Sequence, residues 1–180
     1  MTCSRPISLL AVALLAACGA WTGLLATGCR PPGPAGGDAS GPDLIGAWRA
    51  QLQFTSGAFA AVKDLEFMYV FNAGGMLTES SNYDGAPPVP PAYGIWRRTG
   101  PGRFEAKYEF YVTRAPATLA EITGGGGWLP AGRGVFTETI TLAADGGSFT
   151  SSIRYEAFDA AGRPAEGGGE AEGRGVKLTF

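Results

Sequence analysis

Apolar and polar residues alternate along much of the chain, most clearly in 103–112. One face of this segment would carry apolar residues and the other charged ones: Phe104, Ala106, Tyr108, Phe110 and Val112 against Arg103, Glu105, Lys107 and Glu109. Successive side chains of a strand point to opposite faces, so the segment predicts a β-strand with one buried and one wet face. The same period recurs in 44–54, 65–71, 149–155 and 176–180. No window has a convincing helical period.

Glycine-rich turn signals separate these segments. Short ones lie at 72–75, 99–102 and 145–147, and longer connections are expected at 55–63, 84–91, 114–132 and 159–170. The pattern predicts an all-β domain of about eight antiparallel strands. Closure into a single up-and-down barrel would leave no exposed strand edge, so we expect a barrel, with a β-sandwich as the alternative.

The first part of the chain has the composition of an export signal. Arg5 is followed by an uncharged, mostly apolar run from Pro6 to Gly28, and then by the Pro/Gly-rich stretch 29–42. A basic start, an apolar core and small residues before a cleavage site are typical of secretory signal peptides. We therefore expect a signal peptide at 1–28, a solvated linker at 29–42 and the β domain at 43–180.

Two cysteines in this leader follow short runs of small residues, Leu25-Ala26-Thr27-Gly28-Cys29 and Leu15-Ala16-Ala17-Cys18. Both strings resemble the lipobox of bacterial lipoproteins, whose cysteine receives a lipid and becomes the mature N-terminus. We expect lipidation at Cys29, because cleavage there exposes the linker, with Cys18 as the alternative. The third alternative is that the leader is not cleaved and anchors the protein. The uncharged run from Pro6 to Gly28 is about long enough to cross a bilayer, which takes ~20 residues. All three place the domain outside the cytoplasm in the cell envelope; release as a secreted protein is the remaining alternative.

Composition excludes several kinds of chemistry. The 180 residues include no histidine, and all three cysteines lie in the leader. A Ser-His-Asp triad, a thiolate nucleophile and a Cys- or His-rich metal site are therefore excluded from the domain. The net charge of −2 comes without a basic cluster, so nucleic acid is not an expected partner. No cofactor is implied, and an enzyme is not favoured.

Two charged residues share a face with apolar neighbours. Glu138 has the parity of Phe136 and Ile140, and Arg174 has the parity of Val176 and Leu178. The structural interpretation is a buried ion pair that closes one end of the barrel, because an unpaired buried charge is costly. The functional interpretation is that one of them contacts the polar end of a ligand.

Aromatic residues are the other candidates for ligand contact. Besides packing the core, they could line a cavity for a small hydrophobic molecule. Trp128 follows four glycines and could be a lid over the barrel mouth or a plug against it. The ligand-binding candidates are Trp48, Phe67, Tyr69, Tyr108, Phe110, Glu138, Tyr155 and Arg174.

Gly46-Ala47-Trp48 resembles the Gly-x-Trp that opens lipocalins and other calycin barrels. In those families the Trp plugs the narrow end and an Arg of the last strand packs over it, which would be Arg174 here. The segments 93–104 and 139–149 resemble a group of bacterial secreted proteins with a lipocalin-like or allene oxide cyclase-like barrel. The resemblance covers most of 44–180 and implies a hydrophobic ligand inside the barrel.

Three hypotheses follow. The first is an exported, lipid-anchored barrel that binds a small hydrophobic ligand or an envelope partner. The second is an enzyme similar to allene oxide cyclases, with Glu138 as the acid that acts on a lipid-like substrate. The third is a small outer-membrane barrel, because alternating short and long connections are typical of that class.

Overall fold

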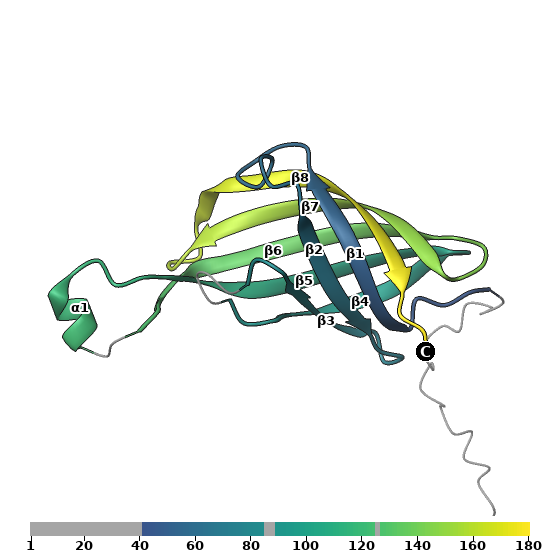
Figure 1. Cartoon of the computed structure of the whole chain (residues 1–180), viewed down its shortest axis with the longest axis horizontal. Coiled ribbons are helices and arrows are strands. Elements are labelled where there is room, and N and C mark those ends of the chain that lie inside the picture. Colours follow the sequence, from purple (N-terminus) through teal and green to yellow (C-terminus); the bar gives the residue numbers. More distant parts are fainter. Residues whose placement is uncertain (1–40, 85–88, 125–126) are drawn as a thin grey trace, which may run out of the picture. The chain divides into compact units, whose positions relative to one another are not determined.

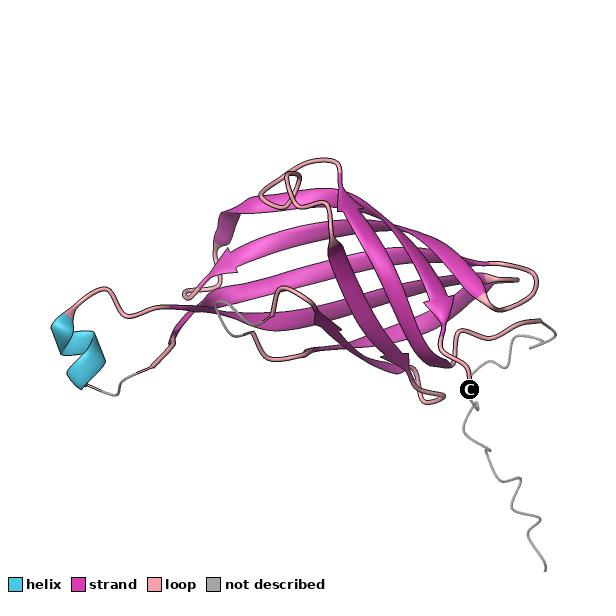
Figure 2. Ribbon diagram, in the orientation of Figure 1, coloured by secondary structure: helices cyan, strands magenta, loops and turns pink. Residues whose placement is uncertain are grey.

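The alternating segments form eight antiparallel strands that close into one barrel in the computed structural model (Figures 1 and 2). The structure describes residues 41–84, 89–124 and 127–180. Each strand pairs with the next, and β1 pairs with β8. The elements are β1 (Gly46–Phe54), β2 (Leu65–Phe71), β3 (Met76–Ser81), β4 (Ala92–Gly100), β5 (Arg103–Arg114), α1 (Leu119–Thr123), β6 (Leu129–Leu142), β7 (Ser148–Asp159) and β8 (Pro164–Lys177).

This architecture confirms the predicted all-β, eight-stranded up-and-down barrel; the sandwich alternative is wrong. The predicted signal peptide, both candidate lipidation cysteines, Cys29 and Cys18, and nearly all of the linker lie outside the described residues. Among the described helices, none is long and apolar enough to cross a membrane.

In most strands the more apolar face points into the barrel and forms its core. The fully buried large side chains are Leu44, Trp48, Tyr69, Phe71, Leu77, Phe104, Tyr108 and Ile140, together with Glu138. The outer face carries charges, several of them in pairs such as Arg97–Glu105 at 2.6 Å and Arg133–Glu109 at 2.7 Å. The outer face also exposes large apolar side chains such as Met68, Tyr93 and Ile95. The interior of a transmembrane barrel is polar, whereas this interior is mostly apolar, and that difference argues against the outer-membrane hypothesis.

Aromatic packing closes the end of the barrel at which the short turns lie. The Trp48 ring is 5.2 Å from that of Phe149, and its indole N–H donates to the carbonyl of Leu44 at 2.8 Å. The cation over Trp48 is Lys177, whose Nζ lies 5.4 Å from the ring centroid. The prediction that Arg174 packs over Trp48 is therefore wrong.

Strand β8 differs most from the sequence prediction. It begins at Pro164, so the long connection expected at 159–170 is instead a tight turn followed by strand. Ala171, Gly173 and Gly175 point inward, while Arg174 and Val176 are exposed on the outside. A side chain at Gly175 would collide with the Phe149 ring, so the large aromatic of β7 occupies the space that an inward β8 side chain would need. The parity assigned to Arg174 and its apolar neighbours was therefore inverted.

The short helix α1 was not predicted. Its five residues lie in the connection between β5 and β6, and the Thr118 hydroxyl accepts the Glu121 N–H at 3.2 Å as an N-cap. A helix this short completes little more than one turn, so it leaves no periodic signal in the sequence.

Candidate functional site

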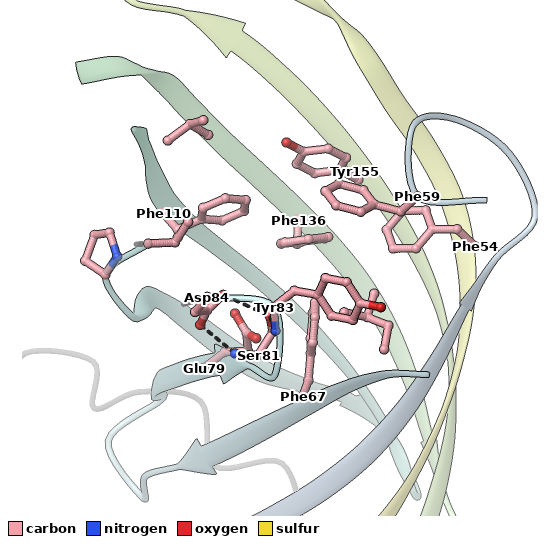
Figure 3. A pocket seen from close by; sticks show the side chains of 14 residues that line it. Phe54, Phe59, Phe67, Glu79, Ser81, Tyr83, Asp84, Phe110, Phe136 and Tyr155 are labelled. Carbon is pink, nitrogen blue, oxygen red and sulfur yellow. Dashed lines mark hydrogen bonds between the residues drawn. The ribbon is translucent and has the colours of Figure 1, made fainter. Parts of the chain in front are cut away.

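A pocket of about 220 Å³ opens at the other end of the barrel, where the long connections lie (Figure 3). Its walls come from β1, β2, β3, β5, β6 and β7, and the connections after β1 and β3 contribute to the rim. Most of the surface is apolar. The aromatic side chains that line it are Phe54, Phe59, Phe67, Tyr83, Phe110, Phe136 and Tyr155.

The aromatic wall is continuous because neighbouring rings are in contact. Phe136 stacks on Tyr155 with 4.9 Å between centroids and meets Phe67 edge-on at 5.5 Å. Phe59, from the connection between β1 and β2, lies 5.3 Å from Phe54. These contacts hold the rings in place, so the wall is formed before any ligand arrives.

Polar groups gather on one side of the pocket. Glu79, Ser81, Tyr83 and Asp84 line it there, all from the end of β3 and the connection that follows (Figure 3). The Ser81 backbone N–H donates to Asp84 Oδ2 at 2.6 Å, and the Ser81 hydroxyl donates to Asp84 Oδ1 at 2.8 Å. The Tyr83 hydroxyl donates to Asp64 at 2.6 Å. These bonds hold the turn after β3 in one conformation.

Glu79 is the exception within this group. It is 4% exposed, and its Oε1 has no hydrogen-bond partner among the described residues. Burial raises the pKa of Glu79 well above its usual value, and the like charges of Asp84 and Glu138 raise it further. Leaving a polar atom unpaired at this depth costs free energy. Glu79 Oε1 could therefore form a hydrogen bond that no described residue supplies.

A second acidic group lies deeper in the interior. Glu138 of β6 accepts hydrogen bonds at Oε2 from the hydroxyls of Tyr108, at 3.0 Å, and Tyr69, at 3.2 Å. Burial raises the pKa of Glu138, and the hydroxyls of Ser151, Tyr108 and Tyr69 oppose that rise. Burial also raises the pKa of both tyrosines, with the charge of Glu138 adding to it.

Glu138 and Arg174 do not form the expected ion pair, so that prediction is wrong. Arg174 lies on the outer face, and the partners of Glu138 are two phenols. Glu138, Tyr69 and Tyr108 do not line the pocket, so this cluster belongs to the packed interior. That placement weakens the enzyme hypothesis, which needs Glu138 to contact substrate.

The structure places the predicted site residues in five different surroundings. Phe67, Phe110 and Tyr155 line the pocket, and Tyr69, Tyr108 and Glu138 form the inner cluster. Trp48 lies at the closed end and Arg174 outside. Trp128 is 48% exposed and does not line the pocket, so it neither covers nor plugs it in this structure.

The sequence analysis missed Glu79, although the signal that selected Glu138 was present. Glu79 has the parity of Leu77, which is buried, and lies opposite Tyr69 of β2 and Ala92 of β4 in the sheet. Its strand, Met76–Ser81, is short and otherwise polar on both sides of Glu79. One apolar neighbour is too little to assign a face.

Comparison of the chain with models of protein families, with curated proteins and with solved structures found no match. The resemblance to lipocalin-like barrels therefore stays a prediction, and function is inferred from the pocket. Across the described residues, no group of three or more His, Cys, Asp or Glu side chains is arranged to hold a metal ion.

Proposed function

We propose that this protein is an exported barrel that binds a small, largely apolar molecule in the open-end pocket. The observation that carries the proposal is a preformed aromatic cavity with one buried, unpartnered carboxyl group in its wall. Ligand sites typically combine a mostly apolar lining with a few convergent polar groups. Packing alone would not require a cavity beside Glu79.

The size of the pocket limits the ligand. A cavity of ~150 Å³ accommodates benzene, and pockets for drug-sized molecules usually begin at ~300 Å³. At about 220 Å³, this pocket fits one ring with a short substituent. A long acyl chain would exceed it.

Filling part of the pocket with a larger side chain should weaken binding. Val112 lines the pocket and its neighbour Tyr111, on the opposite face of β5, is 72% exposed. We expect Val112→Trp to weaken binding of 2-phenylethanol at least about tenfold, measured by titration calorimetry, because the indole occupies the ligand volume. Tyr111→Trp is the matched control and should bind as the unmodified protein does. Unchanged affinity in Val112→Trp would contradict the proposal.

Export and lipid anchoring are part of the proposal and rest on the leader sequence. We expect Cys29→Ser to abolish incorporation of radiolabelled palmitate in a bacterial host and to release the domain from the membrane fraction. Cys18→Ser is the control. Loss of label in Cys18→Ser alone would assign the modification to Cys18. Absence of label from the unmodified protein would contradict lipidation.

A further inference from the structure

The chemistry around Glu79 restricts the polar end of the ligand, provided that the proposed function holds. Glu79 lines the pocket, and its buried Oε1 lacks a partner among the described residues, whereas Asp84 already accepts two hydrogen bonds from Ser81. A carboxylate oxygen can only accept hydrogen bonds. A bound molecule that satisfies it must therefore bring a donor.

The sign of the surrounding charge points the same way. Two carboxyl groups, those of Glu79 and Asp84, line the pocket, and no lysine or arginine is among the described residues that do so. An anionic ligand would meet like charges without a counter-ion in a poorly solvated site, which is unfavourable. A cation would be attracted by both acids.

We propose that the ligand is a small amine with an apolar body of about one ring, and that its ammonium group binds the carboxylate of Glu79. The apolar body would lie against Phe67, Phe136 and Tyr155. The charge-assisted hydrogen bond would satisfy the oxygen that the free protein leaves unpaired.

This pairing makes binding depend on pH. Burial and the charges of Asp84 and Glu138 favour protonated Glu79 in the free protein, and the buried phenols of Tyr69 and Tyr108 add no positive charge. An ammonium ligand requires the carboxylate, so its binding releases a proton from Glu79. Affinity for an amine should therefore rise as pH increases through the pKa of Glu79, while affinity for a neutral ligand should not.

Three ligands with the same phenylethyl body test the inference: 2-phenylethylamine, 2-phenylethanol and 3-phenylpropanoate. By titration calorimetry at pH 8 we expect the amine to bind at least about tenfold more tightly than the alcohol, and the carboxylate most weakly. Glu79→Gln should remove the preference for the amine and retain binding of the alcohol. Glu172→Gln, a substitution at an exposed glutamate of the outer face, is the matched control and should retain the preference.

The outcomes separate this inference from the proposed function. If the alcohol binds and the amine binds no better, or if Glu79→Gln keeps the full amine preference, the amine assignment is wrong and the binding pocket stands. If none of the three ligands binds, both are wrong. The pH dependence of the unmodified protein gives a second readout: amine affinity that is flat from pH 5 to pH 8 would also overturn the role of Glu79.

Discussion

Trp48→Ala is expected to lower the free energy of unfolding by about 3–5 kcal/mol, the range measured when large buried aromatics are truncated. Trp48 is fully buried at the closed end, in contact with the ring of Phe149. Its removal would leave a cavity between β1 and β7 and would also leave the buried carbonyl of Leu44 without its indole donor. The loss should appear as a lower midpoint in urea-induced unfolding followed by circular dichroism.

Trp128→Ala is the matched control, because it removes the same side chain from a half-exposed position. We expect a change within about 0.5 kcal/mol there. The loss of unfolding free energy in Trp48→Phe should lie between those of the two alanine variants, since phenylalanine keeps an aromatic ring and loses only the hydrogen bond and part of the volume. Equal destabilisation by the Trp48 and Trp128 alanine variants would contradict the assignment of Trp48 as the plug of the closed end.

The second large effect is a loss of stability as the pH rises. Burial raises the pKa of Glu79 and of Glu138 in the folded protein, whereas an unfolded glutamate titrates near ~4.3. Between those values the folded state binds more protons than the unfolded state, so the free energy of unfolding decreases with pH. Each group contributes about 1.4 kcal/mol per pH unit from the unfolded pKa up to its folded pKa, above which the loss is complete.

The glutamine variants isolate this effect. Glu79→Gln should be more stable than the unmodified protein at pH 8 and should show a shallower decline from pH 5 to pH 8 in urea unfolding. Glu138→Gln should behave similarly, because an amide oxygen can still accept from Tyr69 and Tyr108. Glu172→Gln, on the outer face, should change the free energy by no more than about 0.5 kcal/mol.

Two half-buried acids at the surface act in a different pH range. Hydrogen bonds from Arg114 lower the pKa of Glu121 to about 2, and those from Arg163 lower the pKa of Asp159. These two groups add stability above their unfolded pKa values, and that stability is lost only as the pH falls below about 4.

A free energy of unfolding that rises from pH 5 to pH 8 would contradict the buried, protonated state of Glu79 and Glu138.

Prediction from the sequence succeeded where the signal is local. The alternation in 103–112 and in 65–71 assigned both the strands and their inward faces, because the two-residue period depends only on strand geometry. The same signal placed Phe67, Phe110 and Tyr155 inside, where they line the pocket.

Strand β8 shows where such a signal fails. Its inward residues include Gly173 and Gly175, which carry no hydrophobic side chain, and its outward residues include Val176. Counting apolar residues therefore selected the wrong face. The space inside had already been filled by Phe149, a constraint from another strand that the local pattern of β8 does not contain.

The sequence by itself determined most of the strands, most of their buried faces and the absence of histidine chemistry, while the export leader stays a prediction. These follow from the order and type of neighbouring residues. Only the tertiary structure decided that the inward residues divide into a packed core and a pocket, that Glu138 bonds two tyrosines, and that Glu79 has an unpaired oxygen. Those features depend on how side chains from several strands share one interior volume, which no segment of the chain specifies alone.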